Sequence, residues 1–393
     1  MNHKVSLGLT ISIAALACAV TFILTSFFSL QGFNSQVQDV KEKAEKYDRL
    51  EALDTYVHEN YYTRIDEDAA MDGLLKGYVA GLGDRYSSYM TPEEYASLQQ
   101  KESGRSVGIG ISVQEDAETG VPVILLVEDN SPAAEAGLAV DDRIVGVEGE
   151  DAASLGYEET VTRIRGEENT SVTLQILRGE EELSFTITRR TFEVTTVYSK
   201  MLDNGVGYIR ITNFRENTVE QFQDALDTLT ANGAKGLLFD VRSNGGGLLD
   251  SLEKMVDPLL PEGVIATATY QEGNTETVVY SDASELDLPM VVLINENSAS
   301  AAELFAASLR DFKGAKLVGK QSFGKGVMQV TSRLDDGGGL TLTVATYQTA
   351  RSECYDGVGL VPDVEVEAGE DTRIADGDPL TDPQLAAAMQ LFE

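Results

Sequence analysis

The chain has 393 residues, 42% of them hydrophobic, so it is long enough to bury the cores of two or three domains. It carries 65 acidic against 30 basic side chains, a formal net charge of −35 at pH 7, and such a surface repels nucleic acid. The two histidines, His3 and His58, lie outside every candidate site, which disfavours a Ser-His-Asp triad and a zinc centre. We therefore expect no metal and no cofactor.

An uncharged apolar run of 26 residues, Val5 to Leu30, follows the N-terminus. About 20 helical residues cross a bilayer core, so residues 5–30 are expected to form a transmembrane signal-anchor. The run is too long for the apolar part of a cleaved signal peptide, and no clear small-x-small cleavage site follows it. The prediction is a single-pass plasma-membrane protein with residues 1–4 in the cytoplasm and the catalytic part outside it.

The spacing of Leu50, Leu53 and Val57 predicts a polar helical region over residues 31–103. A stalk or a dimerisation arm is its expected role, and no chemistry is assigned to it.

Short β-like runs then alternate with turns over residues 104–190, with one helix expected at 157–164. The pattern GIGI, followed by SPA, AGL and D-R-I-V-G-V-E-G, resembles a PDZ domain, although Asp141 stands where that family often has glycine. A PDZ edge strand accepts a peptide as an added strand. The resemblance implies that a protein's C-terminal tail binds at Gly108, Ile109, Gly110 and Ile111; an ordinary β-turn is the alternative.

From Thr191 onward, buried-type strands alternate with helices, a pattern typical of a central sheet covered by helices. Strands are expected at residues 206–214, 235–242, 290–295 and 339–350. This predicts an α/β core over residues 191–370, followed by a helical tail over residues 371–393. Sites in such sheets form where strands end.

The first candidate loop contains Ser300, at the start of a helix. A serine there feels the positive end of the helix dipole, and the neighbouring N–H of Ala301 is free to bind an oxyanion. Ser300-Ala-Ala-Glu303 is also a capping box, so an ordinary helix start is the alternative.

The second candidate loop contains Lys325, which lies between Gly324 and Gly326 in an apolar segment. Burial lowers the pKa of a lysine, and a neutral amine can serve as a general base. A solvated turn lysine is the alternative.

The third candidate loop is Asn244-Gly245-Gly246-Gly247, directly after a strand. Its N–H groups could form half of an oxyanion hole or bind an anion. A phosphate loop would need a Lys-Ser/Thr pair soon afterwards, and none follows. A plain turn is the remaining alternative.

Together, the segments 242–247, 298–303 and 322–329 resemble the carboxy-terminal processing, or tail-specific, serine peptidase family. That family has an R-x-N-x-G-G loop, an S-A-S-A-x-E helix start and a T-F-G-K-G-x-x-Q loop. Gly245 replaces a common proline, Ala302 a common serine and Ser322 a common threonine. None of these departures removes a reactive group.

The resemblance implies a Ser-Lys dyad acting through an acyl-enzyme, in which Ser300 is the nucleophile, Lys325 the base and Gln329 the residue that positions the lysine. Backbone N–H groups of Ala301 and Gly246 would form the oxyanion hole. Arg165 resembles a family arginine that couples the PDZ domain to the active site.

The sequence therefore predicts a membrane-anchored serine endopeptidase with an α/β core of crotonase-like architecture, a preceding PDZ domain and N-terminal helices. Its expected partners are protein substrates, bound by their C-terminal tails, and the membrane. Helices at both ends suggest a homodimer, and an activator or adaptor protein is a further expectation. The alternatives are a catalytically inactive PDZ adaptor and a crotonase-like acyl-transfer enzyme.

Overall fold

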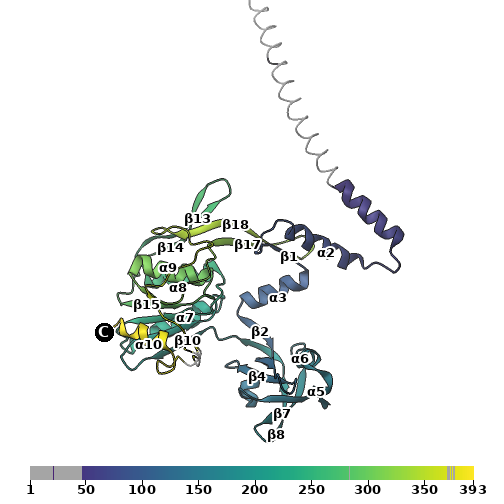
Figure 1. Ribbon diagram of the computed structural model, residues 1–393, viewed down its shortest axis with the longest axis horizontal. Coiled ribbons are helices and arrows are strands. Elements are labelled where there is room, and N and C mark those ends of the chain that lie inside the picture. The colour runs from purple at the N-terminus through teal and green to yellow at the C-terminus, as the bar shows by residue number, and fades with distance from the viewer. Residues whose placement is uncertain (1–20, 22–46, 283, 370–371, 373, 375–376) are drawn as a thin grey trace, which may run out of the picture. The chain divides into compact units, whose positions relative to one another are not determined.

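The computed structural model describes residues 21, 47–282, 284–369, 372, 374 and 377–393 (Figure 1). The chain divides into two compact units, residues 1–74 and 75–393. Apart from residue 21, the expected membrane span over residues 5–30 lies outside the described part of the chain. Within that described part, no helix combines the length and the apolar character needed to cross a membrane.

The N-terminal helical region is less uniform than its sequence predicts. Residues 47–60 are helical, and α2 (Glu67–Ala80) and α3 (Pro92–Glu102) follow. A turn and the short strand β1 (Ser88–Met90) separate α2 from α3. β1 pairs with a strand near the far end of the chain, so this region contributes to the folded core and is not only a stalk.

The PDZ region folds as an antiparallel sheet with three short helices. Its sheet contains, in spatial order, β3 (Ile111–Glu115), β4 (Pro122–Val127), β5 (Arg143–Val147), β7 (Ser171–Arg178) and β8 (Glu181–Thr188), with β6 (Glu150–Asp151) beside β5. The helices are α4 (Pro132–Ala136), α5 (Ala152–Leu155) and α6 (Tyr157–Ile164). The helix predicted at 157–164 is therefore confirmed. A separate ladder joins β2 (Arg105–Gly108) to β9 (Arg190–Glu193).

The departure at Asp141 has a local explanation. Its φ is +70°, in the left-handed region that favours glycine, which accounts for the glycine common in the PDZ family. The next residue, Asp142, is fully buried and binds Arg178 Nε at 2.7 Å. This ion pair holds the turn in place without the glycine.

The core of the second half is a six-stranded sheet. Its spatial order is β10 (Val197–Met201), β11 (Gly207–Ile211), β12 (Leu237–Asp240), β15 (Met290–Ile294), β16 (Lys316–Gly319) and β19 (Val364–Glu365). β10 is antiparallel to β11, and all the other neighbours are parallel. The predicted buried strands at 235–242 and 290–295 are thus adjacent, and their carboxyl ends meet at one edge.

Alternating side chains of these strands face two apolar layers. On one face, Phe239 and Val292 pack with α7 (Thr218–Ala231), α8 (Leu249–Val256) and α9 (Ala301–Lys313). On the other face, Leu238 and Val291 pack with α10 (Pro383–Gln390). The predicted central sheet covered by helices is confirmed.

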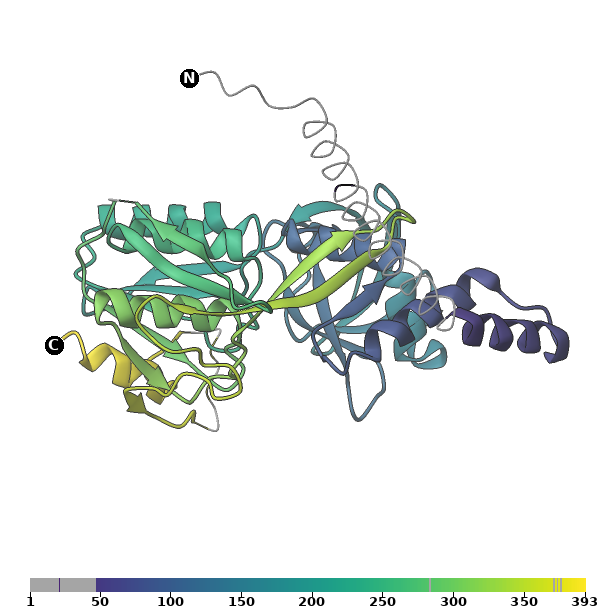
Figure 2. The ribbon, with the colours of Figure 1, turned by 90° about the horizontal axis from the view of Figure 1, so that it is seen from above.

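A second sheet, entirely antiparallel, was not predicted. Its strands pair in the order β1, β18 (Gly339–Thr349), β13 (Gly263–Tyr270) and β14 (Thr275–Ser281). A fifth strand, β17 (Val327–Arg333), also pairs with β18. The sheet residues Ala266, Val279 and Ala345 join the same apolar cluster as α8 and α9, so these helices lie between two sheets (Figure 1). β17 and β18 form a long hairpin, seen as paired yellow-green arrows in Figure 2.

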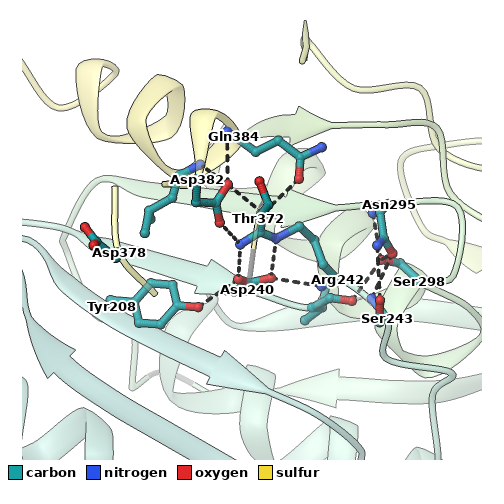
Figure 3. A network of polar contacts seen from close by, with 12 residues as sticks. Tyr208, Asp240, Arg242, Ser243, Asn295, Ser298, Thr372, Asp378, Asp382 and Gln384 are labelled. Atoms are coloured by element: carbon teal, nitrogen blue, oxygen red, sulfur yellow. Dashed lines mark hydrogen bonds and ion pairs between the residues drawn. The ribbon is translucent and has the colours of Figure 1, made fainter. Parts of the chain in front are cut away.

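A buried charge network fastens α10 to the parallel sheet (Figure 3). Arg242, just after β12, binds Asp240 and Asp382 through Nη2 at 2.6 Å each, and all three side chains are fully buried. Arg242 Nη1 also donates to Gln384 Oε1 at 2.8 Å, and the Tyr208 hydroxyl donates to Asp240. The C-terminal helix is thereby attached two residues before the glycine loop that starts at Asn244.

Candidate active site

Ser300 lies on a sharp turn between β15 and α9. Its φ and ψ are 56° and −119°, whereas an ordinary N-cap residue has an extended backbone with negative φ. A positive φ at a residue other than glycine stores strain and is concentrated at functional sites. The turn is held by Ser298, whose hydroxyl donates to the Val241 carbonyl at 2.8 Å. The backbone at Ser300 is therefore unlike that of a plain helix start.

A single buried carboxylate connects the serine turn to the lysine loop. Glu303 is fully buried, and its Oε2 accepts the backbone N–H of Ser300 at 2.9 Å and that of Lys325 at 2.8 Å. Its Oε1 accepts the Gly324 N–H at 2.7 Å and the Ser322 hydroxyl at 2.6 Å. The capping box expected from Ser300 and Glu303 is present, and the same side chain also fixes the loop that carries Lys325.

A tyrosine provides a second connection between the same two residues. The hydroxyl of Tyr347, on β18, donates to the Lys325 carbonyl at 3.0 Å and lies 3.4 Å from Ser300 Oγ. Tyr347 is buried, and burial raises the pKa of its hydroxyl, which therefore stays protonated. The side chain of Ser300 and the backbone of Lys325 thus contact the same hydroxyl.

The amine of Lys325 lies over an aromatic ring. Its Nζ is 4.4 Å from the ring centroid of Tyr86, and no hydrogen bond reaches it from any residue that the structure describes. Burial lowers the pKa of Lys325, and the guanidinium of Arg85 lowers it further, whereas the carboxylates of Asp84 and Glu303 oppose this shift. The amine is partly desolvated and free to change partners.

Gln329 lies in the same pocket, on the strand that follows the lysine loop. Its Nε2 donates to the Thr343 hydroxyl at 3.1 Å. A register irregularity between Met328 and Gln329 lies directly beside it. Its expected role in positioning Lys325 stays a prediction, because here it bonds to the neighbouring strand.

The glycine loop lies against the serine turn. A Cβ on Gly246 would come within 2.9 Å of the Ala301 nitrogen, so only glycine fits there. The N–H of Gly246 donates to Asn244 Oδ1 at 2.8 Å, whereas the N–H of Ala301 has no partner in the described structure. Ala301 can therefore serve as an oxyanion donor as it stands. The same role for Gly246 stays a prediction that requires its N–H to leave Asn244.

Most of the predicted site residues line one cavity of about 620 Å³, although Gly246 is not among its lining residues. Ser300, Lys325, Gln329 and Tyr347 all contribute to it. Apolar side chains form much of the remaining wall: Leu98, Phe214, Leu248, Leu304, Val327 and Met328. The cavity can hold a peptide segment with an apolar side chain close to the serine.

Three family models match the chain: peptidase family S41 over residues 205–366, the PDZ domain over residues 107–188, and the N-terminal domain of activating protease CtpB over residues 14–94. The carboxy-terminal processing protease CtpA of Bacillus subtilis is 35% identical over 356 residues, which cover 90% of this chain and 75% of that protein. The chain belongs to the carboxy-terminal processing proteases of peptidase family S41. It is thus a serine-type peptidase.

Other relatives agree with this assignment. A carboxyl-terminal-processing protease of Synechocystis sp. is 35% identical over 315 residues, 79% of this chain and 71% of that protein. A solved S41 protease from Bacteroides fragilis shares the fold, with a TM-score of 0.59 and 19% identity over 84% of this chain and 90% of that one. The crotonase-like description of the core stays a prediction.

The PDZ groove of this S41 peptidase forms a separate cavity of about 240 Å³. It is lined by the predicted residues Gly108, Ile109, Gly110 and Ile111, and also by Arg165. The carbonyls of Ile109 and Gly110 accept hydrogen bonds from the backbone N–H groups of Ala133 and Glu128, respectively. The N–H groups of Ile109 and Gly110 themselves have no partner in the described part of the chain. Free N–H groups suit a terminal carboxylate. The predicted tail-binding residues and Arg165 are therefore brought together in one groove.

Sequence reasoning missed two contributors to the S41 site. Tyr86 lies in a stretch that predicts only a helix followed by a turn, and no periodicity connects it with Lys325, which is 239 positions away. Tyr347 lies on a strand that was predicted. Which face of that strand points toward Ser300 is decided by its pairing in the second sheet, which was not predicted. The cluster of Asp84, Arg85 and Tyr86 in one turn was the available signal, since charged and aromatic side chains on loops often belong to sites.

Proposed function

We propose that this S41 peptidase is an endopeptidase that holds a protein's C-terminal tail in its PDZ groove and cleaves the chain with Ser300 as nucleophile and Lys325 as base. The observation that carries the proposal is that both residues line one cavity and are tied together by the Glu303 carboxylate. No histidine lies in that cavity, so the partly desolvated amine of Lys325 is the best candidate base.

In the first step, neutral Lys325 takes the hydroxyl proton of Ser300 while Oγ attacks the carbonyl carbon of the substrate. Negative charge develops on the carbonyl oxygen, where the N–H of Ala301 can stabilise it. The C–N bond then breaks, and the lysine ammonium gives its proton to the leaving amine. Water, activated by the same amine, hydrolyses the acyl-enzyme and restores both residues.

The Lys325 side chain must turn for this reaction. Its Nζ lies over Tyr86 and forms no hydrogen bond with Ser300 in the described structure. Rotation about its flexible four-carbon stem brings the amine to the serine. In this proposal, Gln329 on the strand after the lysine loop leaves Thr343 and binds the amine in its new position.

The apolar wall of the cavity favours substrates with an apolar side chain beside the cleaved bond. Burial of one such side chain contributes about 1.5–3 kcal/mol. Charged groups, Lys101, Glu102 and Arg215, also line the cavity. We place the charged parts of a substrate near these three residues.

The remaining proposals concern location and assembly. The uncharged run over residues 5–30 supports a membrane anchor with the catalytic part outside the cytoplasm. Exposed apolar side chains of the N-terminal region, such as Leu53, Tyr56 and Tyr62, are a surface on which a homodimer or an activator could bind.

The test follows cleavage of an unfolded protein with an apolar C-terminal tail by the full-length chain in detergent. Wild type is compared with Ser300→Ala and Lys325→Ala, and the free energy of unfolding is measured for each. We expect both variants to lose cleavage. Ser300→Ala should lose less than about 1 kcal/mol of stability, the size of an ordinary cap.

Three outcomes would contradict the proposal. Cleavage by Lys325→Ala at the wild-type rate would require another base. Normal turnover by Ser300→Ala, with a stability loss above about 1 kcal/mol, would make the serine a cap alone. Tail binding by wild type without any cleavage would support the PDZ adaptor instead.

A further inference from the structure

A turn from the N-terminal region carries an aromatic ring to the proposed base. Tyr86 lies in this turn, and its ring centroid is 4.4 Å from Lys325 Nζ. The Arg85 guanidinium lies 4.6 Å from the same centroid and hydrogen-bonds to the Tyr86 hydroxyl. Both Tyr86 and Lys325 line the cavity that contains Ser300. The ring is therefore part of the active-site wall.

The turn is held firmly against the catalytic core. Asp84 accepts the backbone N–H of Tyr86 at 3.1 Å and the hydroxyl of Ser87. Ser87 Oγ in turn accepts the backbone N–H of Thr343 at 3.1 Å, and the hydroxyl of Thr343 accepts from Gln329. The position of the Tyr86 ring is thus set by the strand beside the predicted catalytic glutamine.

The ring distinguishes the two protonation states of the lysine. The face of an aromatic ring attracts a cation within about 6 Å of its centroid and has no comparable attraction for a neutral amine. Among the described residues, nothing donates to or accepts from Lys325 Nζ, so no hydrogen bond competes with the contact to the ring. Loss of the proton therefore removes what keeps the amine at the ring.

We propose that Tyr86 is a positioning residue for the base: its ring holds Lys325 while the lysine is charged and releases it toward Ser300 once the lysine is neutral. This inference rests on the proposed Ser-Lys mechanism. Tyr86, which comes from a segment outside the peptidase core, would thereby influence the pH at which Lys325 can act as a base.

Several charged or titratable groups surround Lys325 besides Tyr86. Arg85 lowers the pKa of the lysine, whereas Asp84 and Glu303 raise it. The other titratable groups that line the same cavity are Lys101, Glu102, Arg215 and Tyr347. Of these groups, Arg85 also contacts Tyr86, through both the ring and the hydroxyl. Tyr86→Phe removes only the hydroxyl, so the comparison of Tyr86→Leu with Tyr86→Phe isolates the effect of the ring.

The experiment measures the rate at which a fluorophosphonate probe labels Ser300 in the full-length chain, across a pH range from about 6 to 10. Labelling requires the neutral lysine, so the rate rises with pH through the lysine pKa. The Tyr86→Leu substitution removes the attraction of the ring for the charged form of Lys325. The midpoint of the labelling rate against pH should therefore move to lower pH in this variant. Below the wild-type midpoint, Tyr86→Leu should label about three- to tenfold faster than wild type.

Two further substitutions at Tyr86 test the ring itself. Tyr86→Phe keeps the aromatic face and should keep the wild-type midpoint, whereas Tyr86→Trp offers a stronger face and should move the midpoint to higher pH. Tyr280→Leu, at an exposed tyrosine of β14, is the matched control and should not move it. A structural role alone would lower labelling at every pH without moving the midpoint.

The outcomes separate this inference from the mechanism on which it rests. If Lys325→Ala abolishes labelling and the midpoints of Tyr86→Leu and Tyr86→Trp equal that of wild type, the inference about Tyr86 is wrong and the dyad stands. If Lys325→Ala labels as fast as wild type, the dyad is wrong and the inference with it. Absence of labelling in wild type over the whole range also contradicts both.

Discussion

Glu303 and Lys325 are joined by a hydrogen bond of 2.8 Å from the lysine backbone N–H to the glutamate Oε2, across 22 positions of the chain. The same oxygen accepts the N–H of Ser300. One carboxylate, fully removed from solvent, therefore joins the turn of Ser300 to the loop of Lys325. Glu303, which looks only like a helix-capping residue in the sequence, also holds the Lys325 loop next to Ser300.

Glu303→Gln should uncouple the two loops. Four donors point at the two carboxylate oxygens, and an amide has only one oxygen, so at least one pair of donors would face an NH₂ group. We expect peptidase kcat to fall about a hundredfold, as misplacement of reacting groups by about 1 Å does. Unpaired buried donors should cost about 1–3 kcal/mol of stability, measured by urea unfolding.

Glu296→Gln is the matched control for this change. Glu296 is exposed on the loop just before Ser300, so both kcat and stability should stay near wild type. Equal activities of the Glu303→Gln and Glu296→Gln variants would show that the carboxylate is dispensable.

Tyr347→Phe should slow the serine without unfolding the protein. The tyrosine has one proton, and the Lys325 carbonyl can only accept it, so the Ser300 hydroxyl is the donor in the 3.4 Å contact. Loss of this acceptor leaves the serine hydroxyl unoriented. We expect labelling of Ser300 by a fluorophosphonate to fall about tenfold, the value of one ordinary hydrogen bond.

Tyr355→Phe provides the comparison for Tyr347→Phe. The two rings lie edge to face with centroids 6.0 Å apart, and the Tyr355 hydroxyl is buried without a hydrogen-bond partner in the described structure. Its removal should leave labelling and stability at wild-type values or slightly raise stability. A similar loss in both variants would point to ring packing as the cause.

The pH dependence of activity should respond to Arg85. Its positive charge disfavours the protonated form of Lys325 and so lowers the pKa of that lysine. Arg85→Gln removes the charge, raises this pKa, and should shift the rising limb of the pH–kcat profile to higher pH, with lower activity at neutral pH. Arg85→Lys keeps the charge and should stay close to wild type; an unchanged profile in Arg85→Gln would contradict the prediction.

The buried charge network predicts a strong dependence on the C-terminal helix. Asp382→Ala removes the buried carboxylate that accepts from Nη1 and Nη2 of Arg242, and loss of a partner from a buried ion pair costs about 3–5 kcal/mol. We expect that loss in the free energy of unfolding, measured in urea. Glu365→Ala breaks an exposed pair with Lys320 and should cost no more than about 1 kcal/mol. If Asp382→Ala and Glu365→Ala lower the free energy of unfolding by similar amounts, the buried network stabilises the protein no more than a surface ion pair does.

Local patterns in the sequence predicted much of the fold. The helix at 157–164 and the strand at 290–295 were located within a residue of their observed bounds. Periodicity works for such elements because it reports one face of one element. The second sheet escaped prediction because β1 and β18 pair across some 250 residues, and no local pattern encodes that register.

By itself, the sequence determined the family, a central sheet covered by helices and the three loops at strand ends, because short motifs and periodicity are local properties. Only the tertiary structure decided which groups surround the reacting atoms. Tyr86, Glu303, Lys325 and Tyr347 come from four separate elements, and their contacts depend on how two sheets close around α9. Burial lowers the pKa of Lys325, and burial exists only once these distant segments have packed together.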